Sequence, residues 1–241
     1  MVSEPGLIWL PACGSTNDEA MSRIDDLSVR AVGADAQTAG RGRRGRTWAS
    51  PPGSGLYLSW IARPTFSARL GAVLPLMGAV AVAEVCEDLG LRPTVKWPND
   101  LLVEGRKLAG VLCEARGTAT HWHAVVGIGL NLRTPADGWP AGVAAVALDT
   151  HLDLVPSARG LAPKLLKRLD HWLERVGREA DPRSLLQAWE LWAPPRGTWM
   201  RRGSVEGRYA GIAPDGALRL DVGDTELLVH AGDVELVDRE D

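Results

Sequence analysis

The segment that most restricts the fold is a glycine- and arginine-rich run at residues 40–46, Gly-Arg-Gly-Arg-Arg-Gly-Arg, which Pro51-Pro52-Gly53 follows closely. Its first six residues match the dinucleotide fingerprint G-x-G-x-x-G, and with Thr47 the run is one substitution from a Walker A loop. Both of those sites are completed by the N-terminus of a helix directly after the glycines. Because the prolines prevent a helix of useful length there, the run is neither a Rossmann site nor a P-loop.

The arginines of this run, which we call the Arg-Gly loop (residues 40–46), carry guanidinium groups that repel one another unless an anion lies among them. Each guanidinium can bind phosphate oxygens through two hydrogen bonds. Apolar segments at residues 29–37 and 56–62 are typical of strands on either side, so we expect a loop that is mobile until its ligand arrives. A solvated basic turn and an arginine-glycine contact with nucleic acid remain alternatives.

A second group of polar residues begins with Lys96-Trp97-Pro98-Asn99-Asp100, at the end of an extended segment, since proline disfavours helix at the residue before it. Lys107 then opens an apolar strand, where its stem is partly buried and its ammonium group requires an anionic partner. That partner is either a phosphoryl or carboxylate oxygen of a ligand, or Asp100 in a structural salt bridge.

Two further motifs are weaker signals by themselves. Gly127 and Gly129 lie at the end of an apolar strand and lack side-chain bulk, which allows another backbone or a flat ring to approach closely. Ser15-Thr16-Asn17 lies at the predicted start of a helix, where these residues act as caps, as ligand contacts or as both.

The order of apolar runs, prolines and glycines predicts an α+β fold. Residues 1–195 are expected to form a mixed, mostly antiparallel central sheet with flanking helices, and residues 196–241 a second domain that is a small β-barrel. Strands are predicted at residues 7–10, 29–37, 56–62, 94–97, 100–103, 107–114 and 121–130, helices at 15–27, 69–89, 157–176 and 181–192, and short strands within 198–237.

Composition excludes several classes of protein. A formal net charge of −3 over 241 residues argues against a surface that binds nucleic acid or an acidic membrane throughout. The longest apolar stretch, residues 71–83, contains proline and glycine and stops at Glu84, so no membrane partner is expected. The cysteines, Cys13, Cys86 and Cys113, are odd in number and widely spaced, which suits reduced thiols in a cytoplasmic protein.

The separate motifs occur together in an order and spacing that resembles the biotin–protein ligases. The residues that carry this resemblance are 14–17, 37–46, 96–100, 107–110 and 127–131, together with Trp48. The resemblance implies a class II synthetase-like catalytic domain followed by an SH3-like β-barrel.

The same resemblance implies a two-step reaction that uses biotin, ATP and Mg²⁺. Biotin and ATP first give biotinyl-5′-AMP, and the biotinyl group then passes to a lysine of a biotin carboxyl carrier protein or domain of acetyl-CoA carboxylase or a related carboxylase. With a predicted catalytic strand already at Leu7, we expect no room for the DNA-binding module of some members, and no DNA partner. A homodimer formed through an exposed sheet edge is compatible with this fold.

The resemblance also implies roles for single residues. Arg43 and Lys107 are expected to act on the phosphates and the carboxylate. For Asp100 we expect a role on the acceptor lysine as a base or positioning group, with the orientation of Lys107 or of a magnesium-bound water as the alternative. Biotin is expected to contact Ser15, Thr16, Asn17, Gln37, Arg41, Gly42, Arg43 and Lys107. ATP or the adenylate is expected to contact Gly40, Arg43, Arg44, Arg46, Trp48, Lys96, Asn99 and Asn131. No metal ligand is assigned, because Mg²⁺ usually binds through substrate phosphates.

Two rival functions remain. A lipoate or octanoate ligase or transferase of the same superfamily would share the fold, and a nucleic-acid-binding protein would use the Arg-Gly loop directly. One family feature has no clear match: residues 232–237 lack the tail arginine that helps some relatives to bind ATP, and Arg239 is displaced. The catalytic role of the tail is therefore open.

Overall fold

The computed structural model describes residues 4–119 and 121–237, and its larger sheet has seven strands in the order β1-β2-β3-β7-β6-β5-β4. Strands β1 and β2 pair in parallel, and the other neighbours are antiparallel. The predicted mixed, mostly antiparallel central sheet is confirmed. Its strands are β1 (Leu7–Leu10), β2 (Ala31–Ala34), β3 (Gly55–Ala62), β4 (Thr94–Lys96), β5 (Asp100–Val103), β6 (Arg106–Gly117) and β7 (Trp122–Asn131).

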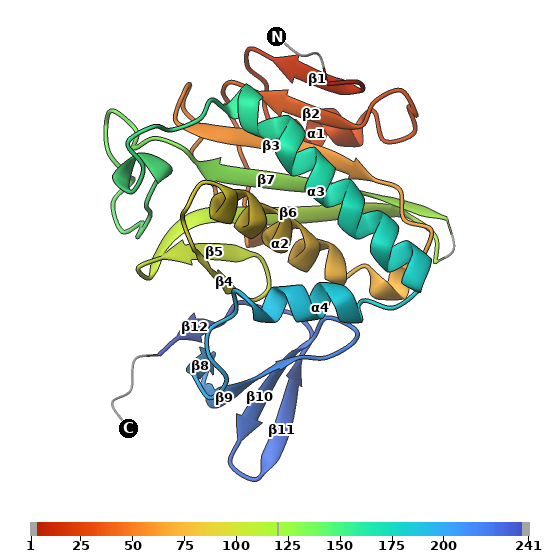
Figure 1. The fold of residues 1–241 in the computed structure, drawn as a ribbon, viewed down its shortest axis with the longest axis vertical. Coiled ribbons are helices and arrows are strands. Elements are labelled where there is room, and N and C mark those ends of the chain that lie inside the picture. Colours follow the sequence, from red (N-terminus) through yellow and green to blue (C-terminus); the bar gives the residue numbers. More distant parts are fainter. Residues whose placement is uncertain (1–3, 120, 238–241) are drawn as a thin grey trace.

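The two faces of this sheet are covered differently. Leu58 and Trp60 of β3 join the main buried core with helices α2 (Val73–Asp88) and α3 (Ala158–Glu179), which cover one face (Figure 1). Ile61 packs on the opposite face in a smaller core with residues of helix α1 (Thr16–Met21). Successive side chains of a strand point to opposite faces, so the residues that alternate with the main core line the α1 side.

All four helices begin or end at other residues than the sequence predicts, and α3 continues three residues beyond residue 176, to Glu179. Helix α1 ends at Met21 rather than near residue 27. At this end the side chains of Ser22 and Arg23 donate hydrogen bonds to the backbone carbonyl of Glu19. Helix α2 begins at Val73 because Ala68–Leu70 form a separate 3₁₀ turn. Helix α4 spans only Arg183–Glu190.

The C-terminal strands form a second, antiparallel sheet in the order β11-β10-β9-β8-β12. Within the described residues β11 and β12 are the two edges of this sheet, so the predicted strands are confirmed but a closed SH3-like barrel is not. The strands are β8 (Trp199–Arg202), β9 (Val205–Ile212), β10 (Leu218–Val222), β11 (Thr225–Val229) and β12 (Glu235–Leu236).

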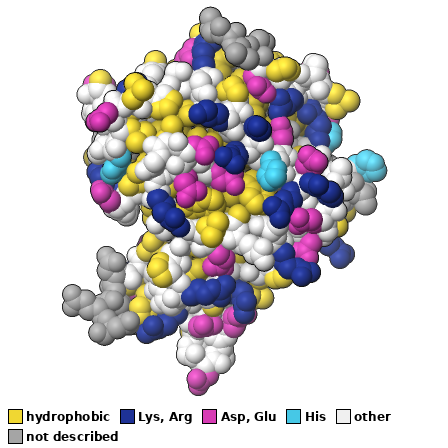
Figure 2. Space-filling model, in the orientation of Figure 1, with side chains coloured by type: hydrophobic (Ala, Val, Ile, Leu, Met, Phe, Trp, Pro, Cys, Tyr) yellow, Lys and Arg dark blue, Asp and Glu magenta, His cyan; other side chains and the backbone are white. Residues whose placement is uncertain are grey.

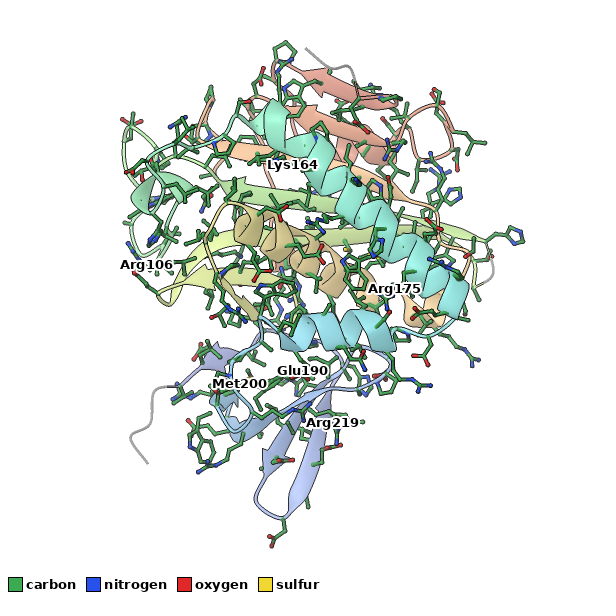
Figure 3. The ribbon with its side chains drawn as sticks, viewed as in Figure 1. Arg106, Lys164, Arg175, Glu190, Met200 and Arg219 are labelled. Atoms are coloured by element: carbon green, nitrogen blue, oxygen red, sulfur yellow. The ribbon has the colours of Figure 1, made fainter. Side chains whose placement is uncertain are left out.

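The small sheet is packed against the larger one through buried side chains. Met200 and Tyr209 belong to the same hydrophobic cluster as the residues of α2. The Trp97 indole donates to the carbonyl of Gly216 over 3.0 Å, and Figure 3 shows Met200 and Glu190 at the junction between α4 and the small sheet. This packing brings the chain's tail to the edge of the larger sheet.

Charged side chains of both signs are interspersed on the face that α2 and α3 cover, rather than gathered by sign (Figure 2). Among the helices in residues 4–119 and 121–237, none has the length and apolarity that a bilayer crossing requires.

Candidate active site

A cavity of about 980 Å³ opens on the α1 side of the larger sheet and unites all the motifs singled out in the sequence. This volume is at the upper end of the range of small-molecule sites. The predicted site residues that line it are Ser15, Thr16, Asn17, Gln37, Arg41, Gly42, Arg43, Arg46, Trp48, Lys96, Asn99, Asp100 and Lys107.

The floor of the cavity depends on glycines of β7. A Cβ atom at Gly129 would lie 2.5 Å from the Trp48 ring, and one at Gly127 would lie 2.0 Å from Asn17 Oδ1. Both side chains therefore occupy space that any other residue would fill. The predicted close approach of a flat ring to this strand is confirmed, and the ring is that of Trp48.

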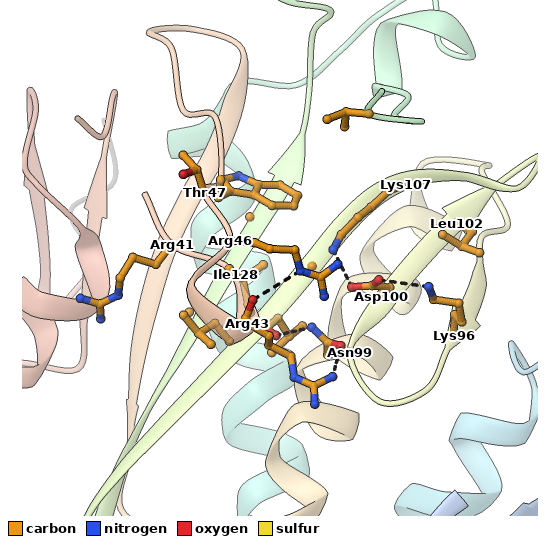
Figure 4. Close-up of a pocket in the computed structure, with 18 of the residues that line it drawn as sticks. Arg41, Arg43, Arg46, Thr47, Lys96, Asn99, Asp100, Leu102, Lys107 and Ile128 are labelled. Carbon is orange, nitrogen blue, oxygen red and sulfur yellow. Dashed lines mark hydrogen bonds and ion pairs between the residues drawn. The ribbon is translucent and has the colours of Figure 1, made fainter. Parts of the chain in front are cut away.

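The carboxylate of Asp100 lies between two lysines, as Figure 4 shows. Asp100 Oδ1 is 2.6 Å from Lys107 Nζ, and Asp100 Oδ2 is 3.5 Å from Lys96 Nζ. Lys107 Nζ also lies 5.3 Å from the centre of the Trp48 ring. The anionic partner that Lys107 requires is thus Asp100 in this structure. Two ammonium groups against one carboxylate leave an excess positive charge at the cavity wall, which suits an anionic ligand.

The Arg-Gly loop is held by carboxylates of the protein itself. Arg41 pairs with Asp18 and Glu114, and these hydrogen bonds outweigh the effect of burial and raise the pKa of its guanidinium. Arg43 and Arg46 pair with Asp233 at 3.0 and 2.6 Å. The sequence predicts that an anion must offset the repulsion between these arginines. In the structure, the carboxylates of Glu114 and Asp233, which are distant in the chain, supply part of this negative charge.

The tail contacts the loop at more than one atom. Arg43 donates to Gly232 O over 3.1 Å and to Asn99 Oδ1 over 3.0 Å, in addition to its pair with Asp233. Arg44, at a backbone φ of 56°, also faces Asp233 at 3.8 Å. Three arginines thus share one carboxylate here, which leaves an excess of two positive charges at this end of the cavity. Arg239 lies outside the described residues.

The polar end of the cavity is formed by the start of α1 and by Gln37. Ser15 is the N-cap of α1 by backbone geometry, but its side chain makes no capping bond. Thr16 contacts Gln37 Oε1 through its backbone N–H at 2.8 Å and through its hydroxyl at 3.1 Å. Gln37 Nε2 in turn donates to Ser50 Oγ over 2.7 Å. These residues do more than cap a helix, because their side chains bond to other parts of the cavity.

Three predicted site residues lie outside the lining of the cavity. Gly40 is in close contact with backbone, since a Cβ atom there would lie 2.4 Å from Trp48 O. The Asn131 amide supports the wall by donating to Lys107 O and Val146 O over 3.2 and 3.0 Å. Arg44 is largely exposed and turned to Asp233.

Sequence reasoning missed four residues that hold the site together: Ser50, Ser59, Glu114 and Asp233. An isolated hydroxyl or acid inside an apolar strand was the available signal for Ser59 and Glu114. Within the described residues, no three His, Cys, Asp or Glu side chains are grouped so that they could hold a metal ion.

Comparison with known proteins gives consistent relatives. Residues 16–131 match the model of the biotin/lipoate A/B protein ligase family. A biotin–[acetyl-CoA-carboxylase] ligase of Mycobacterium tuberculosis is 33% identical over 244 residues, which cover 92% of this chain and 85% of that protein. The bifunctional ligase/repressor BirA of Bacillus subtilis is 32% identical over 214 residues, and the match covers 85% of this chain but only 65% of that longer protein.

A solved structure with the same fold is the biotin protein ligase from Aquifex aeolicus in complex with biotin and ATP. It superposes with a TM-score of 0.79 at 26% identity, over 97% of this chain and 99% of that chain. The fold, the cavity and the sequence matches agree, and this chain belongs to the biotin–protein ligases of the biotin/lipoate A/B protein ligase family.

Proposed function

We propose that this chain is an ATP-dependent biotin–protein ligase. In the first step the biotin carboxylate attacks the α-phosphate of ATP, a carboxyl O–P bond forms, and the bond to pyrophosphate breaks. In the second step the amine of an acceptor lysine attacks the acyl carbon and AMP leaves. The observation that carries the proposal is one cavity that joins the Arg-Gly loop, the Lys107–Asp100 pair and the polar end at Thr16 and Gln37.

The charge of the cavity suits the first step. A carboxylate and a triphosphate repel each other, so bringing them together requires positive groups already in place. Arg43 and Lys107 both line the cavity, each within its own ion pair, and the groups around each pair carry excess positive charge. We assign these two residues to the phosphates and the biotin carboxylate. They would exchange a protein carboxylate for the ligand's anion.

The two ends of the cavity suit the two halves of the adenylate. We assign the biotin side to the polar end, formed by Ser15, Thr16, Asn17, Gln37, Arg41 and Gly42. We assign the ATP side to the other end, formed by Arg46, Trp48, Lys96 and Asn99. Gly40, Arg44 and Asn131 would support these contacts from behind, since they lie outside the lining.

Asp100 is our candidate for the base or positioning group of the second step. Its Oδ1 atom is already bound to Lys107, so it becomes available only when Lys107 turns to the adenylate. Asp100→Asn should then form the adenylate at a normal rate and transfer biotin slowly. Equal slowing of both steps would assign Asp100 to the orientation of Lys107 instead.

Magnesium would arrive with ATP. The described residues offer it no carboxylate cage, so the ion would be held by phosphates and water, as is usual for Mg²⁺. We further propose a biotin carboxyl carrier protein or domain of acetyl-CoA carboxylase or a related carboxylase as acceptor, and the cytoplasm as the place of reaction, where its three free cysteines would stay reduced. We keep residues 1–195 and 196–241 as the proposed domains, and a homodimer as a proposed assembly without DNA or membrane partners.

Mass spectrometry of the small molecules bound to the protein tests this proposal. The protein is incubated with magnesium, ATP and either biotin or lipoate. Biotinyl-5′-AMP formed only with biotin supports the proposal, and lipoyl-5′-AMP would assign the chain to lipoate chemistry. No adenylate with either acid would contradict adenylation and return attention to nucleic-acid binding by the Arg-Gly loop.

A further inference from the structure

Ser59 is a fully buried hydroxyl in the middle of an otherwise mainly apolar strand, β3. Its Oγ atom lies 2.6 Å from Asn17 Oδ1 and 2.8 Å from Thr16 Oγ1, and it lies outside the lining of the cavity. A buried hydroxyl costs free energy unless it is hydrogen-bonded, so these two contacts account for its place in the core.

This cluster has three contacts between oxygen atoms but only two hydroxyl protons, those of Ser59 and Thr16. The Asn17 amide is oriented by its Nδ2 atom, which donates to Glu114 Oε2 over 2.7 Å. Asn17 Oδ1 can only accept, so the single hydroxyl proton of Ser59 goes to it. The single hydroxyl proton of Thr16 then serves either Ser59 Oγ or Gln37 Oε1, so one of these two contacts of Thr16 has no proton.

The cavity surface is therefore rich in acceptors at this end. If Thr16 donates to Gln37 Oε1 at 3.1 Å, its contact with Ser59 at 2.8 Å brings two sets of lone pairs together, and if it donates to Ser59, its contact with Gln37 does so. The side chains of Thr16 and Gln37 both line the cavity. A ligand that brings N–H donors would relieve this crowding of lone pairs, and a ligand without them would leave buried acceptors unpaired.

We propose that Ser59 is a positioning residue that sets substrate specificity: through Thr16 and Asn17 its hydroxyl turns acceptor atoms towards the N–H groups of the biotin ureido ring. This inference rests on the proposed function. The backbone supports it, because Ser59 pairs with Gly127 in the β3–β7 register, and only a glycine at position 127 leaves room for the Asn17 amide. The Asn17 side-chain amide, which extends from α1, is thus held by Ser59 of β3 and by Glu114 of β6.

Calorimetric titration of biotin into Ser59→Ala tests the inference, with Tyr57→Phe as the matched control. Tyr57 lies on the same strand and face, and its hydroxyl makes one hydrogen bond, to Pro51 O, outside this cluster. Losing the oriented hydrogen bond should raise the dissociation constant of biotin about tenfold in Ser59→Ala and less than about twofold in Tyr57→Phe. The KM for ATP and kcat at saturating biotin should stay within about twofold of the unmodified protein.

A double variant separates positioning from general packing. Because Ser59 acts partly through Thr16, Ser59→Ala combined with Thr16→Val should weaken biotin binding by less than the sum of the two single losses. Additive losses, or equal weakening of biotin and ATP, would overturn the inference. Ser59→Cys, which keeps the volume but donates weakly, should show the same selective loss if Ser59→Ala does not fold.

The outcomes distinguish the two proposals. If the unmodified protein binds no biotin, the proposed function fails. If it binds biotin and Ser59→Ala binds within about twofold of it, the proposed function stands and the role of Ser59 is wrong.

Discussion

Asp233→Asn should release the Arg-Gly loop from the tail. The substitution keeps the shape of the side chain but removes the charge that Arg43 and Arg46 contact at 3.0 and 2.6 Å. Asp233 is 32% exposed and Arg46 61% exposed, so each pair resembles a surface salt bridge rather than a buried one. Together with the loss of charge-assisted hydrogen bonding, we expect a cost of about 1–2 kcal/mol to the docked state of the loop.

Limited trypsin digestion of the ligand-free protein measures this cost, because the loop itself contains four arginines. When opening is fast relative to cleavage, the rate follows the population of the open loop. A cost of about 1–2 kcal/mol corresponds to cleavage within residues 41–46 about 5- to 30-fold faster.

Asp224→Asn is the matched control, since Asp224 is an exposed acid in the turn between β10 and β11. The Asp224→Asn variant should be cleaved within residues 41–46 at the rate of the unmodified protein. Equal cleavage of the Asp233 and Asp224 variants would refute the view that Asp233 holds the loop.

Three further outcomes are expected. Arg43→Gly should release biotinyl-5′-AMP into the filtrate after ultrafiltration, because the loop loses its contacts to the tail and no longer covers the intermediate; full retention would contradict this. Gly129→Ala should lower the free energy of unfolding by about 1–3 kcal/mol, since the new methyl group meets the Trp48 ring at 2.5 Å, and an unchanged urea midpoint would argue against this contact. Burial raises the pKa of Cys86 to about 12, so at pH 8 it is a thiol in the folded state and should react with a disulfide reagent only after denaturation; rapid labelling of Cys86 in the native protein would show otherwise.

Much of the fold could be predicted because its signals are local. The turn at Glu104 and Gly105 has positive φ at both residues, and it joins β5 and β6, which were predicted as strands at residues 100–103 and 107–114, into a hairpin. The early end of α1 was not predictable from periodicity, since it depends on side chains of Ser22 and Arg23 that bond back to Glu19. The barrel prediction rested on strand spacing, which does not determine whether the last strand pairs with the first.

The sequence by itself determined which groups the site contains. The prolines after the Arg-Gly loop excluded two phosphate-binding folds, and the lysine and glycine motifs indicated the family before any contact was known. Those features are readable because each depends on neighbours within a few residues.

Only the tertiary structure decided what holds these groups in place. Arg43 meets Asp233 across 190 positions of the chain, Arg41 meets Glu114 across 73, and Asn17 meets Ser59 across 42. A local pattern cannot predict such partners, because the folding of the sheet and the tail determines which distant carboxylates and hydroxyls come within hydrogen-bond distance. For the same reason, Ser59 is one more polar residue in an apolar strand in the sequence, whereas in the fold its hydroxyl lies behind the cavity's polar end and contacts both Thr16 and Asn17.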